Sequence, residues 1–262
     1  MGKGVLVDVT KCIGCRGCQM ACKQWNEIPA EKTRFTGGTN PPTITPKSWT
    51  RIDARKVITG EGEETWRFVK SQCMHCEYPP CEAGCPVGAI TKTADGPVVY
   101  DPERCIGCRY CLYVCPYDGP AFQWDERFGL KRKCLLCDDR IAAGMGPACV
   151  TACPVGTLTF GERNELIARA EKLIAEHPEK YINHIYGKDE LGGTSWLYIS
   201  DVPFAELGLM PKAKQPLPTL VQPAMAAVPW VALTVGGLMS GLYFYTHRRE
   251  QVAAAGKGRE DA

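Results

Sequence analysis

The chain has 262 residues, which is enough for one large domain or two small ones. Its formal net charge is +2, and its basic residues form no patch of the kind that binds nucleic acid, so that class of partner is excluded. Sixteen cysteines are far more than an ordinary chain of this length carries, so cysteine chemistry must decide the interpretation.

The cysteines fall into four groups of four, and none is left over. The first and third groups have the spacing C-x2-C-x2-C-x3-C. Cysteines repeated every third residue converge on one point instead of pairing at disulfide geometry, which argues against a disulfide framework. The groups are Cys12, Cys15, Cys18, Cys22; Cys73, Cys76, Cys81, Cys85; Cys105, Cys108, Cys111, Cys115; and Cys134, Cys137, Cys149, Cys153.

Two metal chemistries fit such groups. Zinc favours two well-separated C-x-x-C pairs for each ion. Three close cysteines followed by a fourth at the start of a helix are instead the bacterial ferredoxin run, which holds a 4Fe-4S cluster. Pro86, Pro116 and Pro154 follow the last cysteine of three groups, and proline suits a first helical position. The pattern therefore favours four 4Fe-4S clusters, with zinc as the alternative.

In a two-cluster ferredoxin unit, the fourth cysteine of one run binds the other cluster. This rule, applied to the second and third groups and then to the remaining two, predicts four crossed ligand sets. The second unit would then be inserted inside the first. The predicted sets are Cys73, Cys76, Cys81 with Cys115; Cys105, Cys108, Cys111 with Cys85; Cys12, Cys15, Cys18 with Cys153; and Cys134, Cys137, Cys149 with Cys22.

The elements between the cysteines are predicted to be short. A lead-in strand precedes each of the two C-I-G-C-R repeats. Residues 26–70 form a Gly- and Pro-rich insertion that ends in two strands and serves as a docking surface or as decoration. Hairpins are expected at Asp95-Gly96 and around 127–129. We expect little apolar core and folding that depends on bound clusters.

The chain changes character after Pro154. A helix is predicted over 163–176, ended by Pro178, because apolar residues recur there at helical spacing. The stretch GGTSWLYIS at 192–200 is typical of a strand. The prolines that follow indicate a stiff linker, and they are Pro211, Pro216, Pro218 and Pro223.

Residues 224–245 carry no charge and are long enough to cross a bilayer of about 30 Å as a helix. Trp230 at one end and Tyr243 and Tyr245 at the other resemble an aromatic belt, which favours a span over a buried soluble helix. Basic residues after the span favour a cytoplasmic C-terminus. The first ten residues show neither an apolar signal core nor twin arginines, so we expect either cytoplasmic residence or folded export with a partner that carries a Tat-type signal.

No catalytic constellation competes with the cysteines, so the chain is predicted to transfer single electrons and not to be an enzyme itself. His75, within C-M-H-C, is expected to have a structural role beside a cluster. Basic residues next to the ligands are either solvated surface groups or groups that tune the cluster potentials. They are Lys11, Arg16, Lys23, Arg104, Arg109, Lys131, Arg132 and Lys133.

The second group has the form C-x2-C-x4-C-x3-C-P and the last the form C-x2-C-x11-C-x3-C-P. This four-group pattern resembles the iron-sulfur subunits of the dimethyl-sulfoxide-reductase family of molybdenum and tungsten oxidoreductases. Within that family, residues 15–42 look most like the beta subunit of formate dehydrogenase with a C-terminal membrane anchor. The resemblance implies that all sixteen cysteines bind clusters. It also implies that the chain relays electrons between a large molybdopterin (Mo/W) catalytic subunit and a membrane cytochrome b or quinone-reactive subunit.

Similar subunits serve nickel-iron hydrogenases and reductases of sulfur compounds or nitrite, and a free-standing membrane polyferredoxin is a further alternative. The predicted fold is α+β, with two ferredoxin-like two-cluster units and one C-terminal transmembrane helix. We expect a single-pass protein of the cytoplasmic (inner) membrane, in contact with its lipid, with the cluster domain on the extracytoplasmic face. The predicted domains are 1–70 with 116–160, 71–115, 161–218, a span at 219–246 and a polar tail at 247–262.

Overall fold

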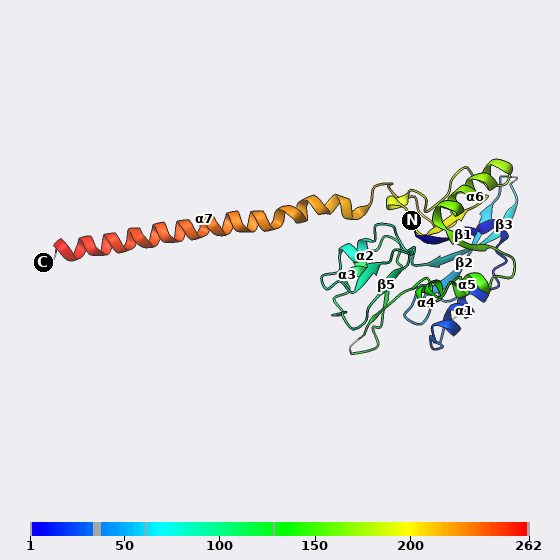
Figure 1. Ribbon diagram of the computed structural model, residues 1–262, viewed down its shortest axis with the longest axis horizontal. Coiled ribbons are helices and arrows are strands. Elements are labelled where there is room, and N and C mark those ends of the chain that lie inside the picture. The colour runs from blue at the N-terminus through cyan, green and yellow to red at the C-terminus, as the bar shows by residue number, and fades with distance from the viewer. Residues whose placement is uncertain (1, 34–37, 61, 128, 261–262) are drawn as a thin grey trace. The chain divides into compact units, whose positions relative to one another are not determined.

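The computed structural model describes residues 2–33, 38–60, 62–127 and 129–260. The chain divides into two units, Met1–Pro218 and Thr219–Ala262. The first unit holds every strand and every cysteine, and the second is helical (Figure 1).

A three-stranded sheet organises the first unit. Strand β1 (Lys3–Asp8) lies in the middle, antiparallel to β8 (Leu158–Glu162) and parallel to β9 (Trp196–Ile199). Val5 faces Phe160 on one side and Trp196 on the other. All four residues of β9 are buried, as expected of a strand covered on both faces. The predicted strand within 192–200 is therefore confirmed, although it is shorter.

Helix α6 (Arg163–Glu176) covers one face of this sheet, and its predicted bounds are confirmed. Its buried stripe of Leu166, Ala170 and Ile174 packs against residues of β1 and β9. The stripe follows the i, i+4 spacing of an amphipathic helix, which is why the sequence alone located it.

The expectation of little apolar core is wrong. Successive residues of a strand point to opposite faces, so β1 and β9 supply two apolar layers. One layer joins Leu6, Leu197 and Ile199 to α6. The other joins Val5, Val7, Trp196 and Tyr198 to buried residues near the cysteines. These strands are far apart in sequence, so the pattern of any one of them does not reveal the shared core.

The two strands predicted at the end of the 26–70 insertion are confirmed, and they pair as a long hairpin. Strand β2 (Thr50–Ile58) pairs antiparallel with β3 (Glu64–Gln72), in register from Thr50 opposite Gln72 to Ile58 opposite Glu64. Of this insertion, residues 34–37 and 61 lie outside the described part of the chain.

Two shorter hairpins also match the predictions. Strand β4 (Ile90–Lys92) pairs with β5 (Val98–Tyr100) across the Asp95-Gly96 turn, and β6 (Ala121–Phe122) pairs with β7 (Lys131–Arg132). The second turn includes residue 128, which the structure does not describe.

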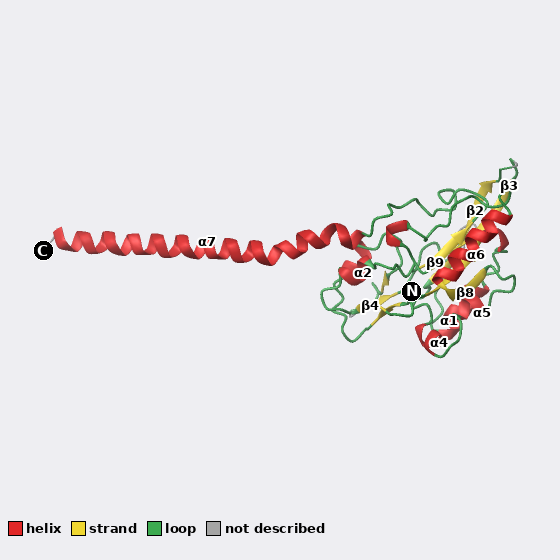
Figure 2. Cartoon of the chain, turned by 45° about the horizontal axis from the view of Figure 1, so that its top comes forward, coloured by secondary structure: helices red, strands yellow, loops and turns green. Residues whose placement is uncertain are grey.

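Five short helices stand beside the cysteine groups. Helix α1 packs against α5, and α2 packs against α3. Figure 2 shows α1, α4 and α5 grouped together, apart from α2 and β4. The helices are α1 (Gly17–Trp25), α2 (Pro80–Ala83), α3 (Tyr110–Tyr113), α4 (Asp138–Ala142) and α5 (Ala148–Thr151), with two 3-10 turns at Val9–Lys11 and Glu190–Gly192.

Helix α7 (Leu217–Glu260) makes up the described part of the second unit from Thr219 onward. Its segment Ala226–Val252 has a mean hydropathy of 1.4 and is long and apolar enough to cross a membrane. The prolines Pro218 and Pro223 lie inside the helix, so their assignment to the linker is wrong. A proline in the first turn removes only an N-H that would lack a partner, and Pro223 removes one intrahelical hydrogen bond. The helix also continues through the predicted polar tail as far as Glu260.

Candidate functional site

All sixteen cysteines lie in the described part of the chain, and each is a free thiol. The disulfide framework considered at first is therefore not present. The thiols gather instead around small cavities between the loops and the short helices.

The first cavity is lined by Cys12, Cys15, Cys18 and Cys153. The loop that carries three of these thiols curls tightly because Gly14 and Arg16 have left-handed backbone, with φ of 68° and 60°. A Cβ at Gly14 would meet the ring of Phe68 at 2.7 Å, so glycine is required there by space as well as by backbone angle. Cys153 arrives from the end of α5.

The second cavity is lined by Cys22, Cys134, Cys137 and Cys149. Cys22 lies one turn after Cys18 in α1, so this helix presents one thiol to each of two neighbouring cavities. The other three thiols come from the fourth cysteine group. The backbone amide of Leu136 donates to Sγ of Cys134 at 3.3 Å.

The third cavity is lined by Cys85, Cys105, Cys108 and Cys111. Gly107 and Arg109 have φ of 70° and 65°, so the second C-I-G-C-R repeat has the same backbone path as the first. The repeat identified in the sequence is thus also a repeat of conformation. The amide of Ala89 donates to Sγ of Cys85 at 3.2 Å.

The remaining four thiols, Cys73, Cys76, Cys81 and Cys115, form a fourth group. Burial raises the pKa of Cys76 well above its usual value, and the neighbouring thiols of Cys73, Cys115 and Cys81 raise it further. These interactions indicate that the four thiols lie near one another. The amide of Gly119 donates to Sγ of Cys115 at 3.4 Å.

The three cavities are small, and each is ringed by four thiols. Around zinc, thiolates would stand roughly 3.8 Å apart, as tetrahedral Zn–S bonds of about 2.3 Å require. No three Cys, His, Asp or Glu side chains within the described ranges converge closely enough to hold one metal ion. Four thiols around one cavity are the ligand set that a 4Fe-4S cluster requires.

Burial makes these thiols poor acids when nothing is bound to them. It raises the pKa of Cys18 to about 11 and that of Cys81 to about 12. Iron binds the thiolate, so loading must release protons from buried groups. The amide donors to Cys85, Cys115 and Cys134 would favour the thiolate form.

Lys70 is a site residue that the sequence reasoning missed. It lies in β3, is only 2 % exposed, and lines both the first and the second cavity. Nothing in its local pattern marks it, since lysine in a strand usually faces water. Of the basic residues that were predicted, Lys131 and Lys133 are also buried.

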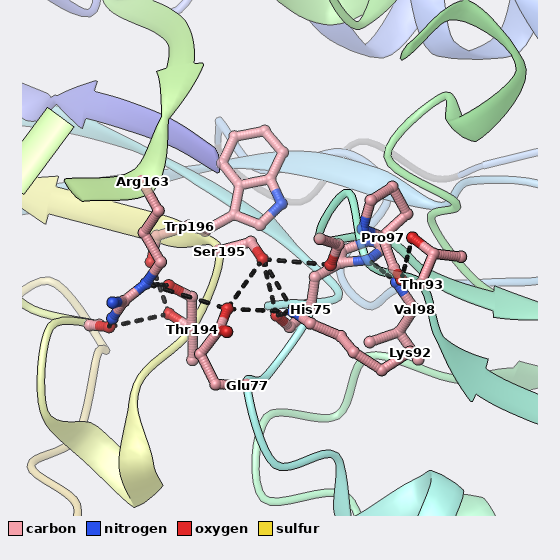
Figure 3. Close-up of polar contacts among 12 residues, drawn as sticks. His75, Glu77, Lys92, Thr93, Pro97, Val98, Arg163, Thr194, Ser195 and Trp196 are labelled. Carbon is pink, nitrogen blue, oxygen red and sulfur yellow. Dashed lines mark hydrogen bonds and ion pairs between the residues drawn. The ribbon is translucent and has the colours of Figure 1, made fainter. Parts of the chain in front are cut away.

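His75 has the structural role that its position indicated. The side chain is fully buried, and its Nδ1 accepts a 2.8 Å hydrogen bond from the amide of Val98 in β5. Its carbonyl accepts from Ser195 Oγ at 3.0 Å and from Lys92 Nζ at 3.1 Å (Figure 3). These contacts fasten the loop between Cys73 and Cys76 to the β4–β5 hairpin and to the strand β9 region.

Other basic residues near the ligands hold loops. Lys23 donates to the carbonyl of Pro29 at 3.3 Å, and Arg16 donates to the carbonyl of Gly38. The guanidinium of Arg109 lies 4.7 Å from the ring of Phe122 and 4.6 Å from that of Trp124. Such contacts give these residues a structural role beyond plain solvation.

Comparison with known proteins agrees with this geometry. Two family descriptions, each a 4Fe-4S dicluster domain, match residues 64–163 and 11–89. The nitrate-inducible formate dehydrogenase iron-sulfur subunit of Escherichia coli K12 is 38 % identical over 198 residues, which cover 74 % of this chain and 66 % of that protein. The hydrogenase-2 operon protein HybA of Escherichia coli O157:H7 is 34 % identical over 236 residues, which cover 79 % and 72 %.

A protein of Nitratidesulfovibrio vulgaris, whose name states no function, is 41 % identical over 256 residues, which cover 96 % of this chain and 68 % of that protein. The chain belongs to the family of formate dehydrogenase iron-sulfur subunits. It spans about two thirds of the length of the curated relatives that it matches.

Membership of this family confirms several of the predictions. Two dicluster domains and sixteen cysteines correspond to four 4Fe-4S clusters, and the α+β class with ferredoxin-type units is correct. Iron-sulfur subunits of this family transfer electrons and are not the catalytic subunit.

Proposed function

We propose that this chain relays electrons between the molybdopterin (Mo/W) subunit of a formate dehydrogenase and a membrane cytochrome b or quinone-reactive subunit. The observation that carries the proposal is the set of four-thiol cavities in a chain 38 % identical to named formate dehydrogenase iron-sulfur subunits. The clusters supply one-electron chemistry when bound. Formate itself would react on the partner subunit.

The crossed ligand sets are part of this proposal. The first set is Cys12, Cys15, Cys18 with Cys153, and it is supported by a cavity that these four thiols line. The second and third sets have the same support, from the cavities lined by the fourth group with Cys22 and by the third group with Cys85. The electrostatic contacts of Cys76 with Cys73, Cys81 and Cys115 support the last set.

The same contacts support a nested arrangement of the two units. Helices α1 and α5 belong to the first and fourth groups and pack together, while α2 and α3 belong to the second and third groups and pack together. These contacts are expected if the chain forms the first cysteine group, then the second and third groups together, and then the fourth group beside the first. The proposed units are therefore 1–70 with 116–160, and 71–115 between them.

The positions of Cys134, Cys73, Cys15 and Cys108 also support a spatial order of the four ligand sets. Burial raises the pKa of Cys134, and among its neighbouring thiols is Cys73 of the inserted unit, so the two units meet there. Cys15 and Cys108, which hold corresponding places in the two repeats, are exposed. We place the sets of Cys15 and Cys108 at the two ends of the relay and the buried sets between them.

Both ends carry apolar side chains that a partner would cover. Near Cys15, Ile13 is 57 % exposed, and near Cys108, Ile106 is 66 % and Tyr113 is 84 % exposed. Large apolar groups beside an accessible ligand are typical of a surface that docks against another protein. The chain's own residues would then bury the inner sets, exclude water and bring each end close to a redox partner.

We place the chain in the cytoplasmic membrane through α7, with the cluster domain on the extracytoplasmic face. The long apolar segment Ala226–Val252 supports an anchor. Arg248 and Arg249 follow the uncharged stretch 224–245 and support a cytoplasmic C-terminus through the positive-inside rule.

A nickel-iron hydrogenase is the second candidate for the catalytic partner. The relative named for the hydrogenase-2 operon favours it, since that protein is matched over 72 % of its length. Anaerobic detergent extraction of the native complex, followed by mass spectrometry and metal and haem analysis, tests both candidates. Molybdenum or tungsten with formate-driven dye reduction would support the first, whereas nickel with hydrogen-driven reduction would support the second. A brown chain that purifies alone would contradict both and indicate a polyferredoxin.

A further inference from the structure

Two buried lysines stand between cysteine sets, one beside each proposed pair of clusters. Lys70 lines the cavity of Cys12, Cys15, Cys18 and Cys153 and also that of Cys22, Cys134, Cys137 and Cys149. Its ammonium donates to Thr50 Oγ1 at 2.5 Å and to Gln72 Oε1 at 3.0 Å. It also lies 4.5 Å from the centre of the Trp196 ring.

Lys131 of β7 has the corresponding place beside the two cysteine sets of the inserted unit, although its own strand belongs to the first unit. It lines the cavity of Cys85, Cys105, Cys108 and Cys111. Its charge acts on Cys111 of that set and on Cys81 and Cys73 of the neighbouring set. Like Lys70 it is 2 % exposed and lies over an aromatic ring, in this case that of Tyr100 at 3.8 Å.

Neither ammonium has a carboxylate partner among the residues that the structure describes. The ion pairs found within these ranges include neither lysine. The Nζ of Lys131 is buried and has no hydrogen-bond partner at all. A buried charge without a partner is strongly unfavourable, so a compensating negative charge is needed at both places.

The thiols supply that charge only when they are ionised. The groups that favour a charged Lys70 are Cys149, Cys18, Cys134 and Cys22, and they come from both sets beside it. Lys131 faces an additional cation, Lys133, and burial together with that cation lowers the pKa of Lys131 to about 8. The ammonium of Lys133, unlike that of Lys131, has hydrogen-bond partners, because it donates to the carbonyls of Val98 and Cys134.

We propose that Lys70 and Lys131 are the internal counter-charges of the two cluster pairs, and that each raises the reduction potentials of the two clusters flanking it. This inference rests on the ligand sets of the proposed function. A 4Fe-4S core with four thiolates carries about −2 when oxidised and about −3 when reduced. A fixed positive charge nearby stabilises the reduced form more than the oxidised form, so its removal lowers the potential.

The test is a redox titration, followed by electron paramagnetic resonance, of the intact complex carrying Lys70→Met or Lys131→Met. Methionine retains an unbranched apolar stem of similar length but no charge. Lys70→Met should change the reduced-to-oxidised ratio of two clusters about tenfold at fixed potential, which is about 59 mV for one electron. The other two clusters should keep their midpoints. Lys131→Met should shift the opposite pair, so each variant is the control for the other.

Iron analysis distinguishes a failure of the proposed function from a failure of the counter-charge inference. If the unsubstituted complex does not hold four clusters of four iron atoms on this chain, the proposed function fails. If it does, and both variants keep that iron with all four midpoints unchanged, the counter-charge inference is wrong. A uniform shift of all four clusters would also overturn it, because a general loosening of the fold does not select one pair. Should either Met variant lose iron, Lys70→Gln and Lys131→Gln are titrated under the same criteria.

Discussion

The amide of Lys3 donates a 2.8 Å hydrogen bond to the carbonyl of Asp95, which joins the tip of the β4–β5 hairpin to the first strand of the sheet. The two backbones are in close contact at this point. Gly96 has φ of 108°, and a Cβ there would lie 2.5 Å from the carbonyl oxygen of Lys3. The hairpin can reach β1 only because residue 96 has no side chain.

We therefore expect Gly96→Ala to lower the melting temperature of the cluster-loaded protein. A left-handed backbone angle alone disfavours alanine by roughly 1–2 kcal/mol, or about 2–8 °C for a unit of this size. The matched control is Gly62→Ala, because Gly62 has φ of 81° in another hairpin turn and open space around it. Gly96→Ala should cost at least twice the control, since its Cβ also collides with backbone. Equal losses would show that the contact with Lys3 is easily relieved.

Arg163 is expected to stabilise the fold through its hydrogen bonds as well as through its charge. Its Nε donates to the carbonyl of Thr194 at 2.8 Å (Figure 3). Its Nη2 donates to the carbonyls of Gly187 at 3.2 Å and Lys188 at 2.9 Å. Lysine retains the charge, but it lacks the planar guanidinium whose rigidly spaced N-H groups reach all three carbonyls. Arg163→Lys should lower the melting temperature by about 4–8 °C, on the scale of about 2 kcal/mol for lost buried hydrogen bonds.

Arg169→Lys in the same helix is the control for that change, because Arg169 is exposed. It should leave the melting temperature within about 1–2 °C of the unsubstituted protein. A similar small effect for Arg163→Lys would mean that water replaces the lost donors.

The crossed ligand pattern predicts which cluster each single cysteine serves. Cys22 lies in α1 among the first cysteine group, yet it lines the cavity of Cys134, Cys137 and Cys149. In Cys22→Ala, the paramagnetic signal that changes should be the one that changes in Cys137→Ala. It should not be the one that changes in Cys12→Ala.

Cys153→Ala is the reciprocal experiment, because Cys153 lies in the fourth group and lines the cavity of Cys12. Its signal should match that of Cys12→Ala. If each substitution instead disturbed the cluster of its own sequence group, the crossed pairing would be refuted.

Membrane anchoring by α7 predicts a strong dependence on position along the helix. Leu238 lies near the middle of Ala226–Val252, where arginine is disfavoured by about 2.5–3.5 kcal/mol. Leu238→Arg should release part of the full-length chain, expressed alone, from membranes during alkaline carbonate extraction. Gln251→Arg, at the polar end of the same segment, should not. Equal retention of both variants would show that α7 is not what holds the chain in the membrane.

Several features of this fold were predictable because they are local. The thiols of the two C-I-G-C-R repeats are arranged by their own loop, in which a glycine and an arginine have left-handed backbone. Helix α6 follows from the spacing of Leu166, Ala170 and Ile174, and the β4–β5 hairpin follows from Asp95-Gly96. In each case the interactions that decide the structure join residues a few positions apart.

What remained hidden depends on residues far apart in the chain. The apolar core exists because β1 pairs with β8 and β9, which lie more than a hundred residues away in the sequence. The residue pattern of one strand does not reveal which strands it pairs with. In the sequence nothing distinguishes Lys70 from other strand lysines, yet β2 and β9 enclose its side chain beside two sets of thiols.

The sequence by itself determined the number and type of cofactors, the protein family and the segment able to cross a membrane, since each depends on residue identity and short spacing. Only the tertiary structure decided which strands form the core and which of the many basic residues lose their water beside the thiols. The physical reason is that burial of a charge depends on what distant segments pack around it, and that packing is set by the whole chain.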